Sequence, residues 1–298
     1  MNKLVEDSII KFPQIVRRTI YVSYSGSWYA EASAYVFYWI LRQITNATIY
    51  IGSAESFIYH IIAYRDEDLL YVSFTEEGSE SIVSRIIHLA NLMRFNLLAV
   101  TPPLPPNIKQ NIPRNVELIE LNHTKTHIYS ILLAAKLSIN TAKLLSPIKQ
   151  RSIKIFKEVK DIGTVYDELI RQYQNILEEI VNKVKKYGKM FIFSTPTLYP
   201  AAIFKRHYTL LQGADAYLFP LSSLISQNTE QLLGNKTPIL LLASSVEEDL
   251  IREARFKLAI KGVINESLIR NIVIKTDPLT AGIYGVLLSE KYLEILSR

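Results

Sequence analysis

The chain contains no cysteine, and this absence removes several chemistries at once. Disulfide bridges, thiol nucleophiles and cysteine-ligated metals are all excluded. The histidines and acidic residues show no spacing typical of metal ligands, so we expect no bound metal. A Walker-type phosphate loop and a dinucleotide glycine fingerprint are also missing, and we therefore expect no cofactor.

Long hydrophobic runs are scarce as well. The longest, such as TPILLLAS at 237–244, have the length of a strand, so we expect no membrane-spanning helix and no membrane partner. The first residues, MNKLVEDSIIKFPQ, mix charged and apolar side chains and lack the apolar core of a signal peptide. A cytoplasmic location is the expected default.

Net charge is positive, at +6 from 34 basic and 28 acidic residues. Much of the excess lies between Lys149 and Lys189, on segments with a helical pattern. A basic helical face can contact nucleic acid, but clustered aromatic residues and base-reading motifs are absent. A solvated basic surface is the favoured interpretation, and we expect no nucleic-acid partner.

Short apolar strands alternate with helical patterns along the whole chain. The predicted strands of the first half are 20–24, 48–51, 69–74, 96–101 and 116–121, and its helices are 28–44, 55–64, 79–93 and 124–145. The predicted strands of the second half are 190–193, 216–219, 239–243 and 271–275, and its helices are 199–212, 246–260 and 278–297. Apolar strands that alternate with helices predict an α/β fold with parallel sheets covered on both faces.

A long helix is predicted at 164–187, between the two halves. Thr164 can cap its start, and Gly188 follows its end. Apolar residues recur at helical spacing within it. We place the first domain at 1–150 and the second, including this connecting helix, at 151–298. Two further caps are predicted, at Asp277 and by a box of Ser245 with Glu248.

Two strand-to-helix turns of the first half are rich in hydroxyl groups. They are YSGSWYAEA at 24–32 and SFTEEGSES at 73–81. Ligands of open α/β sheets bind beyond the carboxyl ends of the strands, and hydroxyls at helix N-termini can hold a phosphate or a polyol there. The alternative, that these hydroxyls only cap helices, stays open. Three carboxylates in the second turn, Glu76, Glu77 and Glu80, would repel a phosphate.

The order of these motifs resembles that of the sugar isomerase (SIS) domain family. The matching segments are SGSWY at 25–29, AESF at 54–57, SFTEEGSESI at 73–82, the helix start at Thr124–Lys125, STPTLYPAA at 194–202 and ADAY at 214–217. They are similar to the isomerase half of glucosamine-6-phosphate synthase, a double-SIS protein. The resemblance implies two αβα three-layer sandwich units with parallel sheets of flavodoxin-like topology, joined by a long helix.

The resemblance also implies a ligand site. The set carried over by position consists of Ser25, Gly26, Ser27, Ser73, Thr75, Ser79, Thr124 and Lys125. In the family, Ser73 and Thr75 match hydroxyls that bind the sugar phosphate, whereas Ser27 and Thr124 match residues that line the sugar cup.

Three positions of this site depart from the family pattern. Glu76 stands where the family has glycine, Gly78 where it has a phosphate-binding threonine, and Trp28 where it has a small serine. A phosphate close to Glu76 would be disfavoured by about 1–4 kcal/mol unless that carboxylate faces solvent or pairs with a cation. Lys125 is the candidate cation.

Catalysis of an aldose–ketose isomerisation needs a base, and often a histidine that opens the ring. The catalytic Gly-Glu-x-x-His-Gly segment of the family is absent here. Glu230, within SQNTEQLLGNKTP, resembles instead the base of the archaeal phosphoglucose/phosphomannose isomerases and is our candidate base. His207 is the candidate for ring opening. The open alternatives are an exposed helical Glu230 and a His207 that faces solvent beside Lys205 and Arg206.

Three functional hypotheses follow. The first is an enzyme that isomerises a hexose phosphate or deaminates an aminohexose phosphate. The alternative is a non-catalytic protein that binds a sugar phosphate or another carbohydrate derivative at a degenerate site, and the third is a structural dimer without a ligand. The resemblance implies a homodimer with its sites near the dimer interface and a small-molecule sugar phosphate as partner.

Overall fold

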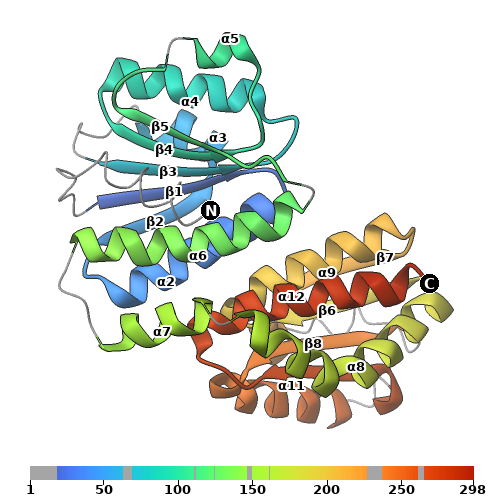
Figure 1. Ribbon diagram of the computed structural model, residues 1–298. Helices are drawn as coiled ribbons and strands as arrows, with labels where there is room; N and C mark the ends of the chain where they lie inside the picture. Colours follow the sequence, from blue (N-terminus) through green and yellow to red (C-terminus); the bar gives the residue numbers. More distant parts are fainter. Residues whose placement is uncertain are drawn as a thin grey trace. The chain divides into compact units, whose positions relative to one another are not determined.

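The computed structural model describes residues 19–62, 69–110, 112–123, 125–145, 150–160, 162–226, 237–260 and 265–298. The chain divides into two compact units, Met1–Val159 and Lys160–Arg298 (Figure 1). The boundary predicted at 150/151 falls at the start of α7 (Gln150–Lys160), and the division between the units falls at the end of the same helix.

The first unit is built on a five-stranded parallel sheet with the order β2-β1-β3-β4-β5. Its strands are β1 (Thr19–Ser25), β2 (Thr48–Ser53), β3 (Leu70–Thr75), β4 (Asn96–Thr101) and β5 (Val116–Glu120). The order is that of flavodoxin-like folds, as predicted. The central strands are almost continuously apolar because both of their faces are buried. All six residues of β3 are buried.

Helices cover both faces of this sheet (Figure 1). On one face lie α2 (Tyr29–Ile44) and α6 (Thr126–Leu145), which pack against each other. On the other lie α3 (Ala54–Ser56) with the π-helical turn Phe57–Ile61, α4 (Glu80–Met93) and α5 (Pro106–Lys109). The helix predicted at 55–64 is thus replaced by α3 and a π-helical turn, and residues 63 and 64 lie outside the described residues.

Among the described helices, α6 is long and apolar enough to cross a bilayer by length and composition. Over half of its most apolar window, 56%, is buried inside the protein. Ile131, Leu133, Ala134 and Leu137 are each at most 1% exposed, and the helix packs on α2. Its apolar composition is therefore accounted for by its place in the core of the first unit.

The second unit repeats the arrangement with a four-stranded parallel sheet of order β7-β6-β8-β9. Its strands are β6 (Lys189–Ser194), β7 (Asp215–Pro220), β8 (Ile239–Ser244) and β9 (Ile269–Ile274). One face carries α9 (Tyr199–Leu211) and α12 (Pro278–Leu296), with α8 (Ile162–Tyr187) packed against α12. The other face carries α10 (Leu221–Ser226) and α11 (Glu248–Ile260). The predicted α/β fold with two parallel sheets is confirmed.

The long helix α8 is confirmed, but it begins at Ile162, so Thr164 lies inside the helix and the cap predicted at Thr164 is wrong. Leu177, Ile180 and Val184 are buried, and the chain leaves the helix at Gly188 with φ +67°. The cap at Asp277 is also confirmed, since its carboxylate accepts from the Leu279 N–H at 3.0 Å. The predicted box of Ser245 with Glu248 is wrong by one residue. Extended backbone at the end of β8 makes Ser244 the N-cap, and Ser244 forms the box with Glu247.

Candidate functional site

The two hydroxyl-rich turns lie side by side at the carboxyl edge of the first sheet. β1 and β3 are neighbours, with Ser25 opposite Thr75, and the strand order reverses direction at this pair. The backbone N–H of Glu76 donates to the Ser25 carbonyl at 3.1 Å, which joins the turns directly. This is the topological switch point, where ligands of open α/β sheets bind.

The Glu76 side chain extends from the turn after β3 to the backbone at the start of α2. One of its carboxylate oxygens, Oε1, accepts from the backbone N–H groups of Trp28 at 2.9 Å and Ala30 at 3.0 Å. The other, Oε2, accepts from the Ser27 N–H at 3.4 Å. The first N–H groups of a helix have no partner within the helix, and they attract negative charge. Glu76 therefore serves as the anion at the N-terminus of α2.

Gly26 leaves the space that this carboxylate occupies. A Cβ at position 26 would lie 2.2 Å from the carboxyl carbon of Glu76, and the residue has φ +124°. Both facts require glycine at this position. Among the described residues, Glu76 forms no ion pair with Lys125; its hydrogen bonds come from the backbone of the opposite turn.

The carboxylates of this turn differ in their environments. Burial raises the pKa of the Glu76 carboxyl, while the N–H groups of Ala30, Trp28 and Ser27 act in the opposite direction. Glu77 accepts from the Tyr29 hydroxyl at 2.9 Å, and burial together with this bond raises the pKa of Tyr29 above its ordinary value. Glu76 and Glu77 therefore both accept hydrogen bonds from the segment that begins α2.

Four of the predicted ligand hydroxyls bond to other protein groups instead of facing a ligand. Ser25 donates to the Ser79 hydroxyl at 3.2 Å, and Ser73 accepts from Ser23 at 3.1 Å. Thr75 donates to the Val100 carbonyl at 3.4 Å. Ser25, Ser73, Thr75 and Ser79 are all buried. The structure brings these predicted residues together, and their hydroxyls join the ends of the strands to one another.

We expect Tyr71→Phe to destabilise the protein by about 0.5–1.5 kcal/mol, because it removes one buried hydrogen bond. The Tyr71 hydroxyl donates to Ser23 at 2.6 Å, and Ser23 donates in turn to Ser73. Urea unfolding measures the change, with the exposed Tyr50→Phe as the control. Equal stabilities of the two variants would contradict a structural role for this hydroxyl chain.

Exposed groups of the same edge are aromatic and polar. The half-buried Trp28 ring lies 5.2 Å from the His127 ring, and the His123 ring lies 3.9 Å from that of Tyr129. Ser27 and Lys125 are exposed, and Thr124 lies outside the described residues. The sequence pattern gave no sign of the Trp28–His127 contact, because the two residues are distant in the chain.

The catalytic candidates lie in the second half of the chain. Glu230 lies outside the described residues. His207 is half-buried in the C-terminal half of α9, eight residues and thus about 12 Å along the helix from its start at Tyr199, which follows the carboxyl end of β6. Its neighbour Lys205 is 1% exposed and donates to Ser289 at 3.0 Å, so His207 does not lie beside an exposed Lys205.

The carboxyl edge of the second sheet repeats one feature of the first. Glu247, in the turn after β8, accepts from the Ser244 hydroxyl at 2.7 Å and from Thr197, in the turn after β6. β6 and β8 correspond in sheet order to β1 and β3. In each unit, a glutamate in the turn after one central strand therefore accepts a hydrogen bond from the turn after the neighbouring central strand.

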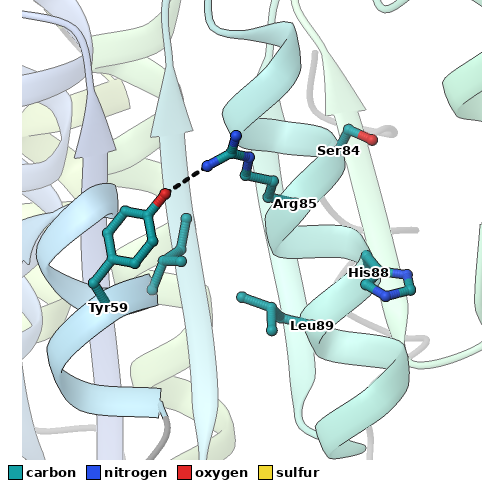
Figure 2. A pocket seen from close by; sticks show the side chains of 6 residues that line it. Tyr59, Ser84, Arg85, His88 and Leu89 are labelled. Atoms are coloured by element: carbon teal, nitrogen blue, oxygen red, sulfur yellow. Dashed lines mark hydrogen bonds between the residues drawn. The ribbon is translucent and has the colours of Figure 1, made fainter.

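A surface pocket of 430 Å³ lies elsewhere, between the π-helical turn and α4 (Figure 2). Its lining consists of Ile58, Tyr59, Ser84, Arg85, His88 and Leu89. Figure 2 shows the Arg85 guanidinium donating to the Tyr59 hydroxyl. None of the predicted site residues that the structure describes lines this pocket, and residues of the middle of α4 form one of its walls. It is separate from the switch point.

Comparison with known proteins gives a likeness of fold. No family model and no curated protein matches the chain. A Bacillus subtilis protein assigned as a phosphosugar isomerase superposes with a TM-score of 0.78 at 12% identity, over 100% of this chain and 94% of the other. A Salmonella typhimurium protein assigned as a sugar-binding protein gives 0.73 at 12%, over 99% and 96%. The C-terminal domain of glucosamine-fructose-6-phosphate aminotransferase from Francisella tularensis gives 0.69 at 14%, over 99% and 93%.

These superpositions cover both units and confirm the fold to which the motifs pointed. The chain has the fold of the SIS phosphosugar isomerases, with two parallel sheets in α/β layers. At identities of 12–14%, the likeness establishes the fold, and the site must be argued from its own residues.

Proposed function

We propose that this protein binds a carbohydrate derivative at the carboxyl ends of β1 and β3 without isomerising it. The observation that carries the proposal is that four of the six predicted ligand hydroxyls already have hydrogen-bond partners within the protein. Ser25, Ser73, Thr75 and Ser79 are buried and bonded to one another, to Ser23 or to the backbone. A sugar phosphate would have to break these bonds to be anchored as the resemblance implies, so tight anchoring for catalysis is not favoured.

The exposed groups of the same edge support binding of a carbohydrate. Sites for small molecules combine apolar or aromatic walls with a few polar groups. Here the Trp28 and His127 rings supply an aromatic wall, and Ser27, Lys125 and the Glu77 carboxylate supply donors and acceptors in the two turns and directly before α6. The fold likeness to a protein assigned as sugar-binding agrees with this hypothesis.

A ligand panel tests the proposal. Thermal unfolding is recorded with glucosamine, fructose and their 6-phosphates, and turnover is followed by ammonia release and by coupled detection of fructose 6-phosphate. We expect at least one carbohydrate to raise the unfolding temperature, since a ligand at a hundredfold its Kd stabilises the folded state by about 2.7 kcal/mol. The Trp28→Ala variant should lose this shift. Turnover of any of the phosphates would contradict the non-catalytic part.

A sugar-phosphate isomerase or deaminase is the second candidate. It is favoured by the fold likeness to a protein assigned as a phosphosugar isomerase, and by Glu230 and His207 as candidate base and ring opener. In that case Glu230→Gln should abolish turnover in the same assays while binding persists. A homodimer belongs to both candidates as a prediction, which sedimentation analysis can test; the cytoplasmic location also stays a prediction.

A further inference from the structure

We propose that Glu76 determines the specificity of this site: its carboxylate occupies the N-terminus of α2, which would otherwise bind an anion, so the site accepts neutral or amine-bearing carbohydrates and excludes a phosphate group there. This inference rests on the proposed function, because it concerns the ligand of the same site. It goes beyond that function because it states that the ligand carries no phosphate group at this position.

The donors around Glu76 converge as they would on a phosphate. Three backbone N–H groups, of Ser27, Trp28 and Ala30, point to two oxygens of one anionic group at 2.9–3.4 Å. Backbone N–H groups at the start of a helix are the usual protein ligands of phosphate oxygens. Here the anion is part of the protein, and it is already bound. An external phosphate must therefore displace Glu76 before it can use the same donors.

Hydrogen bonds hold the turn after β3 in place and oppose the displacement of the Glu76 carboxylate by a phosphate. The Glu76 N–H donates to the Ser25 carbonyl, and the Glu76 carbonyl accepts from the Ser79 N–H at 3.2 Å. The Ser79 hydroxyl donates to the same Ser25 carbonyl at 3.3 Å. On the opposite side, the absence of a side chain at Gly26 lets the carboxylate lie directly over the backbone. The carboxylate is therefore held at a defined position by groups of both turns.

Two further carboxylates beside Glu76 also disfavour a bound phosphate. Glu77 lies beside Glu76 and bonds to Tyr29, and Glu80 accepts from the Gly78 N–H at 3.3 Å at the start of α4. Lys125, directly before α6, and His127 in its first turn belong to the same edge, and the Lys125 cation acts in the opposite direction to the three carboxylates. Three carboxylates in one turn oppose a phosphate dianion and favour an ammonium group, so aminosugars without phosphate are the expected ligands.

Inorganic phosphate is the probe that isolates this inference. Binding is measured by isothermal calorimetry at pH 7.5 for the wild-type protein, Glu76→Gly and the matched control Glu80→Gln, which removes a charge from the same turn and leaves the α2 donors occupied. We expect Glu76→Gly to bind phosphate at least about tenfold more tightly than the wild type, and the control to resemble the wild type.

Glu76→Gln keeps the size of the side chain and protects the test against misfolding of the glycine variant. Its neutral amide competes less well for the N–H groups, so its phosphate affinity should lie between those of the wild type and Glu76→Gly. Circular dichroism and thermal unfolding establish that each variant is folded. Folded Glu76 variants with unchanged phosphate affinity, or a wild-type protein that binds phosphate as tightly as they do, would overturn the inference.

The inference and the proposed function can fail separately. Phosphate binding by the Glu76 variants is measured without any carbohydrate, so its absence disproves the specificity role alone. A wild-type protein that binds none of the carbohydrates disproves the proposed function, whatever the variants do. Wild-type binding of glucosamine 6-phosphate in preference to glucosamine would contradict the specificity while leaving carbohydrate binding intact.

Discussion

Lys205→Met is expected to stabilise the protein at pH 7, on the order of the 1–4 kcal/mol seen when buried ion pairs are replaced by apolar residues of similar volume. Lys205 is 1% exposed between α9 and α12, beneath the Tyr292 ring. Its described hydrogen-bond partner is the Ser289 hydroxyl at 3.0 Å, and Ser289 also donates to the Gly285 carbonyl at 2.8 Å. Methionine would therefore leave Ser289 with a partner.

The stability gained by Lys205→Met should decrease as the pH rises above 7. Burial lowers the pKa of Lys205 to about 7, well below its value in the unfolded chain. Between pH 7 and 10 the unfolded chain binds the proton that the folded protein has lost, so the wild-type protein gains stability as pH rises, by about 1.4 kcal/mol per unit. The advantage of Lys205→Met should be largest near pH 7 and should shrink toward pH 9.

Urea unfolding at pH 7, 8 and 9 measures both effects, with Arg206→Met as the control. Arg206 is the next residue of α9 and is exposed, so its replacement should change neither the stability nor its pH dependence appreciably. A Lys205→Met protein that is less stable than the wild type at pH 7, or that follows the same pH dependence, would refute the account of this buried amine.

Gly26→Ala is expected to lower the free energy of unfolding by about 2–5 kcal/mol, as the sum of backbone strain and steric overlap. At φ +124°, a residue with a side chain is strained. The new Cβ would also overlap the Glu76 carboxyl group, with contacts of 2.2–2.7 Å. The two turns would have to separate, and the hydrogen bonds of Glu76 would be lost.

Gly78→Ala provides the matched comparison within the same site. Gly78 also has a positive φ, +85°, but a Cβ there would meet nothing within 4 Å, so only strain of about 1–2 kcal/mol is expected. The double variant Gly26→Ala with Glu76→Ala relieves the overlap and should recover about 1–3 kcal/mol relative to additivity. Strictly additive losses would show that Glu76 does not lie over Gly26.

Much of the fold could be predicted because local patterns and global arrangement agree. Apolar strands separated by helices allow only a parallel sheet with helices on both faces, and the motif order indicated the SIS arrangement. The capping box was misplaced by one residue, at Ser245 instead of Ser244, because the end of β8 depends on its pairing with β9 and β6. The short π-helical turn at Phe57–Ile61 has no sequence pattern of its own.

The candidate site was predictable only in its location. The hydroxyl-rich turns were identified, but which groups would face one another was not, because hydrogen-bond partners such as Ser25 and Ser79 lie 54 positions apart. The conflict between Glu76 and a phosphate was visible from charge alone. Its resolution, by backbone N–H groups and not by Lys125, required the position of α2 relative to the β3 turn.

The sequence by itself therefore determined the class of fold, the edge of the sheet where the candidate site is proposed and the presence of a carboxylate that would repel a phosphate there, since these follow from periodicity and residue type. Only the tertiary structure decided where Glu76 and Lys205 lie. Pairing of β1 with β3 brings the Glu76 carboxylate to the free N–H groups of α2, and packing of α12 on α9 buries an amine that its charged neighbours suggested was exposed. Charge and length are local properties of a residue, whereas burial is set by segments far away in the chain.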